Sequence, residues 1–129
     1  DGSYVNGIKD RMVLSDLDGL INKRYIVIDG TDNTYKNDSD YIKTGDILCI
    51  LDSKGNYSQS YSICIKGDID GTGTIDVLDM EAIQKSILGI GDKLSGAYKE
   101  AASLSGGVDI TVLDMEVIQK DILGIQKIN

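Results

Sequence analysis

The feature that most constrains the fold is an internal repeat in the second half of the chain. The fourteen residues 77–90 recur 35 positions later as residues 112–125, and the two copies differ at only two places. Apolar residues stand at helical spacing in both copies: Met80, Ile83 and Ile87 in the first, and Met115, Ile118 and Ile122 in the second. The chain is therefore expected to fold around two equivalent amphipathic helices.

The ends of these helices carry their own signals. Asp76 and Thr111 precede the two copies and are suited to capping a helix amino terminus through a side-chain oxygen. Gly89 and Gly124 suit the left-handed residue that often ends a helix. Between the copies, residues 95–102 are predicted to form a short connecting helix.

An acidic loop of twelve residues, 68–79, leads into the first helix. A calcium loop of the EF-hand type places oxygen ligands at its first, third, fifth, seventh, ninth and twelfth places and a glycine at the sixth. Gly73 stands at the sixth place. The predicted metal ligands, with Thr74 at the seventh place, are Asp68, Asp70, Thr72, Thr74, Asp76 and Asp79.

The charges of this loop predict that cation binding and folding are coupled. Two like charges about 4 Å apart repel by roughly 4 kcal/mol at an effective dielectric near 20, and a divalent ion removes that repulsion. Asp79 is one methylene shorter than the usual glutamate, and Thr72 is neutral, so we expect modest affinity of the kind that suffices outside a cell. The alternative is an acidic surface turn without a metal.

The second loop, residues 103–114, lacks most of these ligands. Ser103, Ser105 and Gly107 replace acidic or threonine residues, and Val108 replaces the turn glycine. Because fewer anionic ligands weaken a site for a hard cation, we predict one strong Ca²⁺ site, in the first loop. We expect packing to hold the second loop, with Ile75 and Ile110 paired across the two loops.

Composition excludes several classes of function. The net charge of −8 and the absence of a basic cluster argue against a nucleic-acid partner. The chain has no histidine, and its two cysteines, Cys49 and Cys64, would lack a histidine partner, so we expect a non-enzyme. No apolar run approaches the roughly 20 residues of a membrane span. The first residues show no signal-peptide pattern, and we expect a fragment of a larger secreted protein.

The first half of the chain, residues 1–66, is predicted to be a small β-rich module. Strand-like runs and one short helical run alternate with turn residues. The strands are expected over 4–8, 25–29, 46–51 and 57–65, and the helix over 13–21. The last two strands predict a hairpin that places Cys49 opposite Ser58. In this register Cys49 does not face Cys64. Both cysteines are therefore expected to be buried free thiols and not to form a disulfide.

This half contains six tyrosines, and five of them, at positions 25, 35, 41, 57 and 61, have two interpretations. They are either a platform for a sugar ring or half-buried packing residues, and packing is the expectation. The junction at residues 66–67 has no linker composition, so we expect the two halves to move as one unit.

Residues 66–129 resemble a dockerin. The resemblance rests on the duplicated loop and helix, the glycine-rich aspartate loop and the Leu-Gly-Ile run after each helix. Residues 1–66 are similar, more weakly, to small β modules that precede dockerins. The resemblance implies an α+β chain, with a β-rich module over 1–66 and an all-α, EF-hand-like domain over 67–129. It further implies a secreted, non-catalytic monomer that binds a cohesin domain with Ca²⁺ and attaches a carbohydrate-active protein to a scaffold or bacterial cell surface.

The resemblance also assigns the cohesin-binding residues. They lie just before the last loop ligand and one or two helical turns later: Val77, Leu78, Gln84 and Lys85, and in the repeat Val112, Leu113, Gln119 and Lys120. The alternative is that Val77 and Leu78 fill the protein's own core. Near-identical helices are what a two-fold symmetric binder would show if either helix can meet the partner. Two other function classes are a free calcium sensor, and a calcium-stabilised carbohydrate-binding or adhesin fragment.

Overall fold

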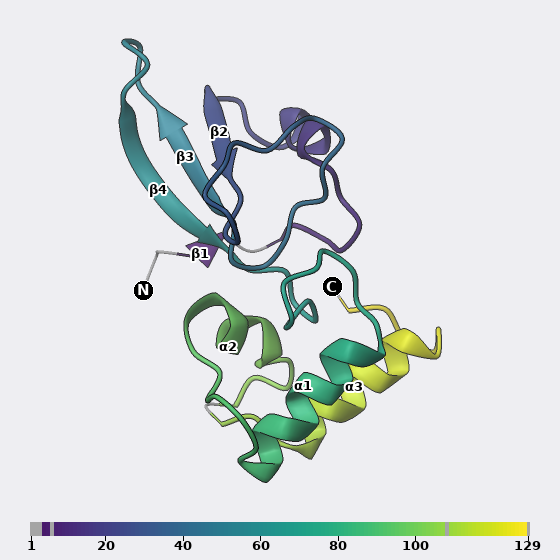
Figure 1. Cartoon of the computed structure of the whole chain (residues 1–129). Helices are drawn as coiled ribbons and strands as arrows, with labels where there is room; N and C mark the ends of the chain where they lie inside the picture. Colours follow the sequence, from purple (N-terminus) through teal and green to yellow (C-terminus); the bar gives the residue numbers. More distant parts are fainter. Residues whose placement is uncertain (1–3, 6, 108, 129) are drawn as a thin grey trace.

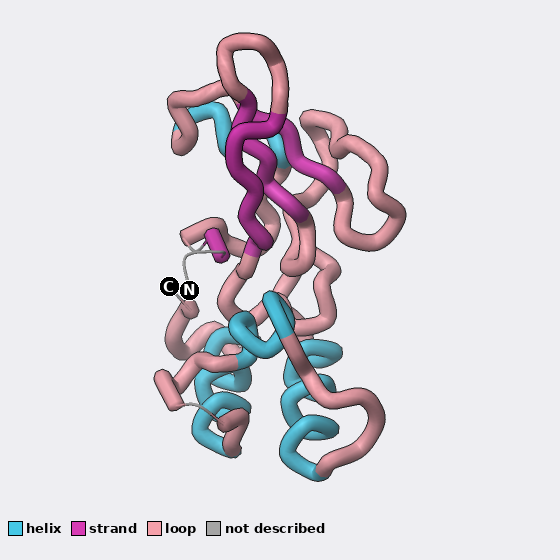
Figure 2. The backbone as a smooth tube through the Cα atoms, turned by 90° about the vertical axis from the view of Figure 1, so that its left-hand side faces the viewer, coloured by secondary structure: helices cyan, strands magenta, loops and turns pink. Residues whose placement is uncertain are grey.

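The computed structural model describes residues 4–5, 7–107 and 109–128 as a mixed α/β protein with one four-stranded sheet and four short helices. The strands and the first helix occupy one half of the molecule, and the three α-helices occupy the other (Figures 1 and 2). The mixed content agrees with the predicted α+β class. Within these ranges, every helix is too short or too polar to traverse a lipid bilayer.

The sheet has the strand order β1-β4-β3-β2, in which β1 runs parallel to β4 and the other pairs are antiparallel. The strands are β1 (Tyr4–Val5), β2 (Tyr25–Ile28), β3 (Ile47–Leu51) and β4 (Tyr57–Ile63). Asn6, inside the strand expected over residues 4–8, lies outside the described residues. The expected helix over 13–21 is a shorter 3-10 helix, η1 (Leu14–Gly19), which buries Leu17 against the sheet core.

The register of the β3–β4 hairpin differs from the prediction. Cys49 lies opposite Ser60, two residues from the expected Ser58. One residue of this difference comes from the turn, because Asp52 pairs with Asn56 through a backbone hydrogen bond of 2.8 Å. The other comes from a bulge beside Ile50 and Leu51. Cys49 and Cys64 are buried free thiols, as expected.

Two hydrophobic clusters form the interior, one in each half. The sheet cluster contains Ile8, Leu17, Val27, Ile42, Leu48, Ile50, Ile63 and Ile65. The helical cluster contains Cys64, Ile69, Ile75, Ile83, Ala101, Ala102 and Ile118. Cys64 and the partly buried Tyr4 belong to the helical cluster although their segments run through the sheet half, so the two cores meet at the end of β4.

The repeat forms α1 (Val77–Leu88) and α3 (Val112–Ile122), which pack side by side and antiparallel (Figure 1). Asp76 and Thr111 cap them as predicted, and each accepts a hydrogen bond from the amide two residues later. Gly89 and Gly124 are left-handed, with φ of 70° and 74°. The connecting helix is α2 (Gly96–Ala102). Ile83 and Ile118, at the same place in the two copies, are fully buried between the helices.

The antiparallel arrangement corrects the expected pairing of Ile75 with Ile110. Ile75 lies at the start of α1, where it packs with Ile128 against Gly67. Ile110 lies at the other end of α1, beside Lys85 and Gly89. Each loop therefore packs against the end of the opposite helix, because two antiparallel helices place their preceding loops at opposite ends.

Polar contacts join the two halves. The Lys66 ammonium donates to the Glu100 carbonyl at 2.8 Å and pairs with the Glu100 carboxylate at 3.1 Å. The Gly67 amide donates to the Ala101 carbonyl at 3.0 Å. The junction is thus tied to α2 directly, without an intervening linker.

Candidate functional site

The first acidic loop is built around two carboxylates with no exposed surface, Asp68 and Asp79. Asp68 Oδ1 accepts from the Thr72 amide at 3.0 Å, and Asp68 Oδ2 accepts from the Gly73 amide at 3.0 Å. Asp68 Oδ2 also accepts from the Thr44 amide, at 2.9 Å, across from the sheet half. The first loop ligand is therefore fixed by three backbone donors.

Asp79 closes the loop from its other end. Its Oδ1 accepts from the amides of Ile69 and Asp70 at 2.8 and 3.0 Å, and its Oδ2 accepts from the Asp76 amide at 2.9 Å. Gly73 allows the sharp turn between them with a φ of 90°. These bonds are the local reason why the loop passes straight into α1.

The structure brings together three of the predicted ligands. Asp68, Asp70 and Asp79 each offer an oxygen within 4.8 Å of the others. Thr72 Oγ1 donates to Asp70 at 3.0 Å, and Thr74 Oγ1 donates to Asp76 Oδ2 at 3.4 Å. Asp76 lies outside the group of three, with its Oδ1 capping α1. Three of the six predicted side chains thus gather, and the others surround them in a chain of hydrogen bonds.

The electrostatics of the three carboxylates favour a cation. Burial raises the pKa of Asp68 to about 6, and burial together with the adjacent Asp70 carboxylate raises the pKa of Asp79 to about 8. Among the described residues, no lysine or arginine forms an ion pair with this cluster. A donor set made only of oxygen suits a hard divalent cation such as Ca²⁺.

The second loop has the same scaffold with different electrostatics. Asp114, also fully buried, accepts from the amides of Leu104, Ser105 and Thr111 at 2.7–2.8 Å, as Asp79 does from its counterparts. The Ser105 hydroxyl, in the place of Asp70, donates to Asp114 Oδ1 at 3.0 Å. Burial alone would raise the pKa of Asp114, but these hydrogen bonds hold it below its ordinary value. Val108 lies outside the described residues.

The two loops differ in whether the buried aspartate needs a positive charge beside it. In the first loop, a second carboxylate faces the buried Asp79. In the second loop, a neutral donor has already satisfied the buried Asp114. The second loop therefore needs no ion to neutralise it, and the first loop is the candidate metal centre.

The predicted partner-binding residues lie mainly on the outer surface of α1 and α3. Val77, Leu78, Val112 and Leu113 are 58%, 53%, 60% and 59% exposed, which overturns the alternative that Val77 and Leu78 fill the core. Gln84, Lys85 and Gln119 are also exposed, and Lys120 is half-buried.

Four further exposed apolar residues, which the sequence-based assignment of the surface missed, extend it: Leu88, Ile90, Leu123 and Ile125. The available signal was the Leu-Gly-Ile run that follows each helix. Along each helix, Leu78 and Leu88, and likewise Leu113 and Leu123, flank an ion pair four residues apart, Lys85–Glu81 at 3.0 Å and Lys120–Glu116 at 3.2 Å. We call these exposed apolar residues in and just after the two helices, 77, 78, 88, 90, 112, 113, 123 and 125, the apolar helix face.

These five tyrosines of the sheet half divide into two groups. Tyr25 and Tyr61 pack against the sheet core as expected. The expectation of packing was wrong for the other three tyrosines, since Tyr35, Tyr41 and Tyr57 are 66%, 45% and 54% exposed. Tyr35 and Tyr41 line an open depression of about 520 Å³ together with polar side chains: Asp29, Asp32, Thr34, Lys36, Asn37, Asp40, Lys43 and Thr72.

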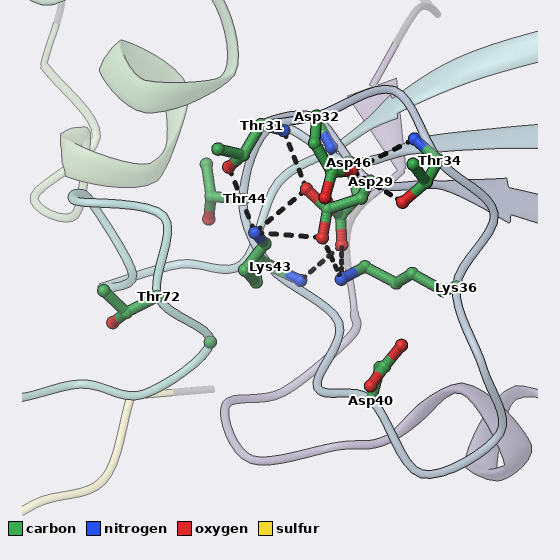
Figure 3. Close-up of polar contacts among 12 residues, drawn as sticks. Asp29, Thr31, Asp32, Thr34, Lys36, Asp40, Lys43, Thr44, Asp46 and Thr72 are labelled. Carbon is green, nitrogen blue, oxygen red and sulfur yellow. Dashed lines mark hydrogen bonds and ion pairs between the residues drawn. The ribbon is translucent and has the colours of Figure 1, made fainter.

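An ion cluster of Asp29, Lys36, Lys43 and Asp46 forms part of the lining of this depression (Figure 3 shows its side chains). The Lys36 ammonium, with a side chain only 3% exposed, pairs with Asp29 at 2.9 Å and with Asp46 at 3.2 Å. Lys43 pairs with the same Asp29 at 3.1 Å. Every charge in the cluster has an opposite partner, so the cluster holds the loop over residues 29–46 in place.

Comparisons of the chain with protein-family models, with curated proteins and with solved structures found no match.

Proposed function

We propose that this chain is a non-catalytic docking module of the dockerin type, which binds Ca²⁺ in its first loop and a cohesin domain through its paired helices. In this proposal the protein is secreted and attaches a carbohydrate-active protein to a scaffold or bacterial cell surface. The observation that carries the proposal is the apolar helix face, which occurs twice at matching positions on two antiparallel helices.

The apolar helix face supports a protein partner over a purely structural role. Leucine, isoleucine and valine side chains that are more than half exposed contribute little to the core of the free protein. The same exposed residues stand in both copies of the repeat, around the same lysine–glutamate pair. An exposed apolar patch rimmed by polar residues is typical of a protein-binding surface.

A bound cation would support the same function by fixing the start of α1. Asp79 is both a candidate ligand and a residue of the first turn of α1, and Leu78 is its neighbour in the chain. An ion held by Asp68, Asp70 and Asp79 would fix the start of α1 and thereby the position of Val77 and Leu78. A partner contact that depends on Ca²⁺ follows from this linkage.

A calcium-dependent binding assay on the full chain tests this proposal. With Ca²⁺ at about 100 times its Kd, the unfolding midpoint is expected to rise by about 10 °C over its value in chelator, because only the folded loop binds the ion. Pull-down against a panel of cohesin domains should capture one or more of them in Ca²⁺ and none in chelator. Equal midpoints in Ca²⁺ and chelator, or capture that survives chelation, would contradict the proposal.

A second candidate function is carbohydrate binding by the sheet half, favoured by the exposed Tyr35 and Tyr41 beside a polar depression. Exposed aromatic rings with carboxylates and amides nearby offer stacking and hydrogen-bonding surface to a sugar.

A glycan array separates the two candidates. If the second is correct, the wild-type chain should bind a defined set of glycans, and Tyr35→Ala together with Tyr41→Ala should lower that signal at least tenfold, roughly the loss expected for two stacking rings. Leu20→Ala, 63% exposed in the same half but outside the depression, is the control. A blank array leaves the docking function alone standing.

A further inference from the structure

The first loop is held from outside by the sheet half. Residues 41–46, just before β3, run alongside the loop, and the Thr44 amide donates to Asp68 Oδ2 at 2.9 Å. This contact joins residues 24 positions apart and is fully buried. The first predicted ligand of the cation therefore has a donor that belongs to neither the loop nor its helix.

The backbone of residues 41–46 also lies close to two glycines of the loop. A side-chain carbon added at Gly71 would lie 2.9 Å from the Thr44 carbonyl oxygen, and one added at Gly73 would lie 2.9 Å from the Ile42 carbonyl oxygen. Arg11 donates its amide to the Gly73 carbonyl at 2.7 Å and has a left-handed φ of 65°. The two loop glycines thus allow the sheet half to approach, in addition to allowing the turn.

Side chains of the sheet half fix residues 41–46 in turn. The Thr44 hydroxyl accepts from the Ile65 amide at 3.1 Å and donates to the Ile65 carbonyl at 3.3 Å. The buried Asp46 accepts from the amides of Lys43 and Gly30 at 2.8 and 2.9 Å. Because Lys36 neutralises Asp46, this anchor carries no uncompensated charge (Figure 3).

We infer that residues 41–46 are a built-in template for the cation loop, with Thr44 as its positioning residue. This inference rests on the proposed cation site. The Thr44 amide orients the Asp68 carboxylate, and the packed carbonyls set the path of Gly71 and Gly73, so part of the order that the ion would otherwise impose is supplied by the protein. Preorganised ligands bind more tightly, because less conformational freedom is lost on binding.

Calorimetric titration of the full chain with Ca²⁺ tests the inference through one hydroxyl. Thr44→Val keeps the shape of the side chain but loses both bonds to Ile65, and we expect its affinity for Ca²⁺ to fall by about tenfold. Thr44→Ser keeps the hydroxyl and should bind within about twofold of wild type. Leu17→Ala, in the sheet core, should lower the unfolding midpoint but leave the affinity unchanged, because Kd is measured on folded protein.

Hydrogen exchange on the wild-type chain supplies a test that needs no variant. In chelator, the amides of Thr44 and Gly73 should exchange at least about 100-fold more slowly than in an unstructured peptide, because Asp68 still accepts from both. Exchange of both amides at unprotected rates, or wild-type affinity in Thr44→Val, would overturn the template. If wild type binds no Ca²⁺, the cation site itself fails and the template fails with it.

Discussion

Replacement of Asp70 by serine should weaken Ca²⁺ binding by about 100-fold or more and leave the chain folded. The change copies the second loop into the first, since Ser105 occupies the equivalent place and satisfies the buried Asp114 with its hydroxyl at 3.0 Å. The amides of Ile69, Asp70 and Asp76 would still donate to Asp79, so the scaffold is retained. Calorimetry measures the affinity, and circular dichroism checks the fold.

The pH dependence of stability gives this variant a second readout. In chelator, the folded wild type binds more protons than the unfolded chain between about pH 4 and pH 8, because Asp68 and Asp79 have raised pKa values of about 6 and about 8. Wild-type stability should therefore fall as the pH rises from 5 to 8. Asp70→Ser removes the carboxylate that helps to raise the pKa of Asp79, so its stability should fall less over that range.

The reverse exchange, Ser105→Asp, is the matched control. It places a carboxylate against the buried Asp114 and should destabilise the chain, but the second loop still has Ser103 and Gly107 at two ligand places and should gain no strong site. If Asp70→Ser binds Ca²⁺ as tightly as wild type, the cluster of Asp68, Asp70 and Asp79 is not the metal centre.

The second large effect concerns the apolar helix face. Single changes Leu78→Asp or Leu113→Asp are each expected to leave cohesin affinity within about threefold of wild type, because the partner can use the unchanged helix in its place. The double change should lower affinity by about 100-fold or more, since a buried aspartate would replace an apolar anchor in both orientations. Surface plasmon resonance against a cohesin captured in the pull-down measures all three variants.

Leu20→Asp is the matched control, because Leu20 is 63% exposed but lies in the sheet half. It should change neither affinity nor fold. If Leu78→Asp alone abolishes binding, only one helix meets the partner and the two-orientation hypothesis is wrong. Full affinity in the double variant would show that the apolar helix face is not the docking surface.

Local signals in the sequence predicted the elements that depend on neighbours in the chain. The repeat gave the boundaries of α1 and α3, and Asp76, Thr111, Gly89 and Gly124 occupy the end positions that their chemistry favours. The twelve-residue spacing gave the group of Asp68, Asp70 and Asp79. These features could be predicted because each rests on hydrogen bonds and side-chain contacts within about a dozen residues.

Tertiary structure decided the features that depend on distant residues. The antiparallel packing of α1 against α3 placed Ile75 and Ile110 at opposite ends and left Val77 and Leu78 exposed. A turn one residue longer than expected and a bulge set the hairpin register, and packing of the two halves brought the Thr44 amide to Asp68. Residue spacing alone does not encode such contacts, because they form only when elements far apart in the chain pack together, bury apolar surface and satisfy one another's polar groups.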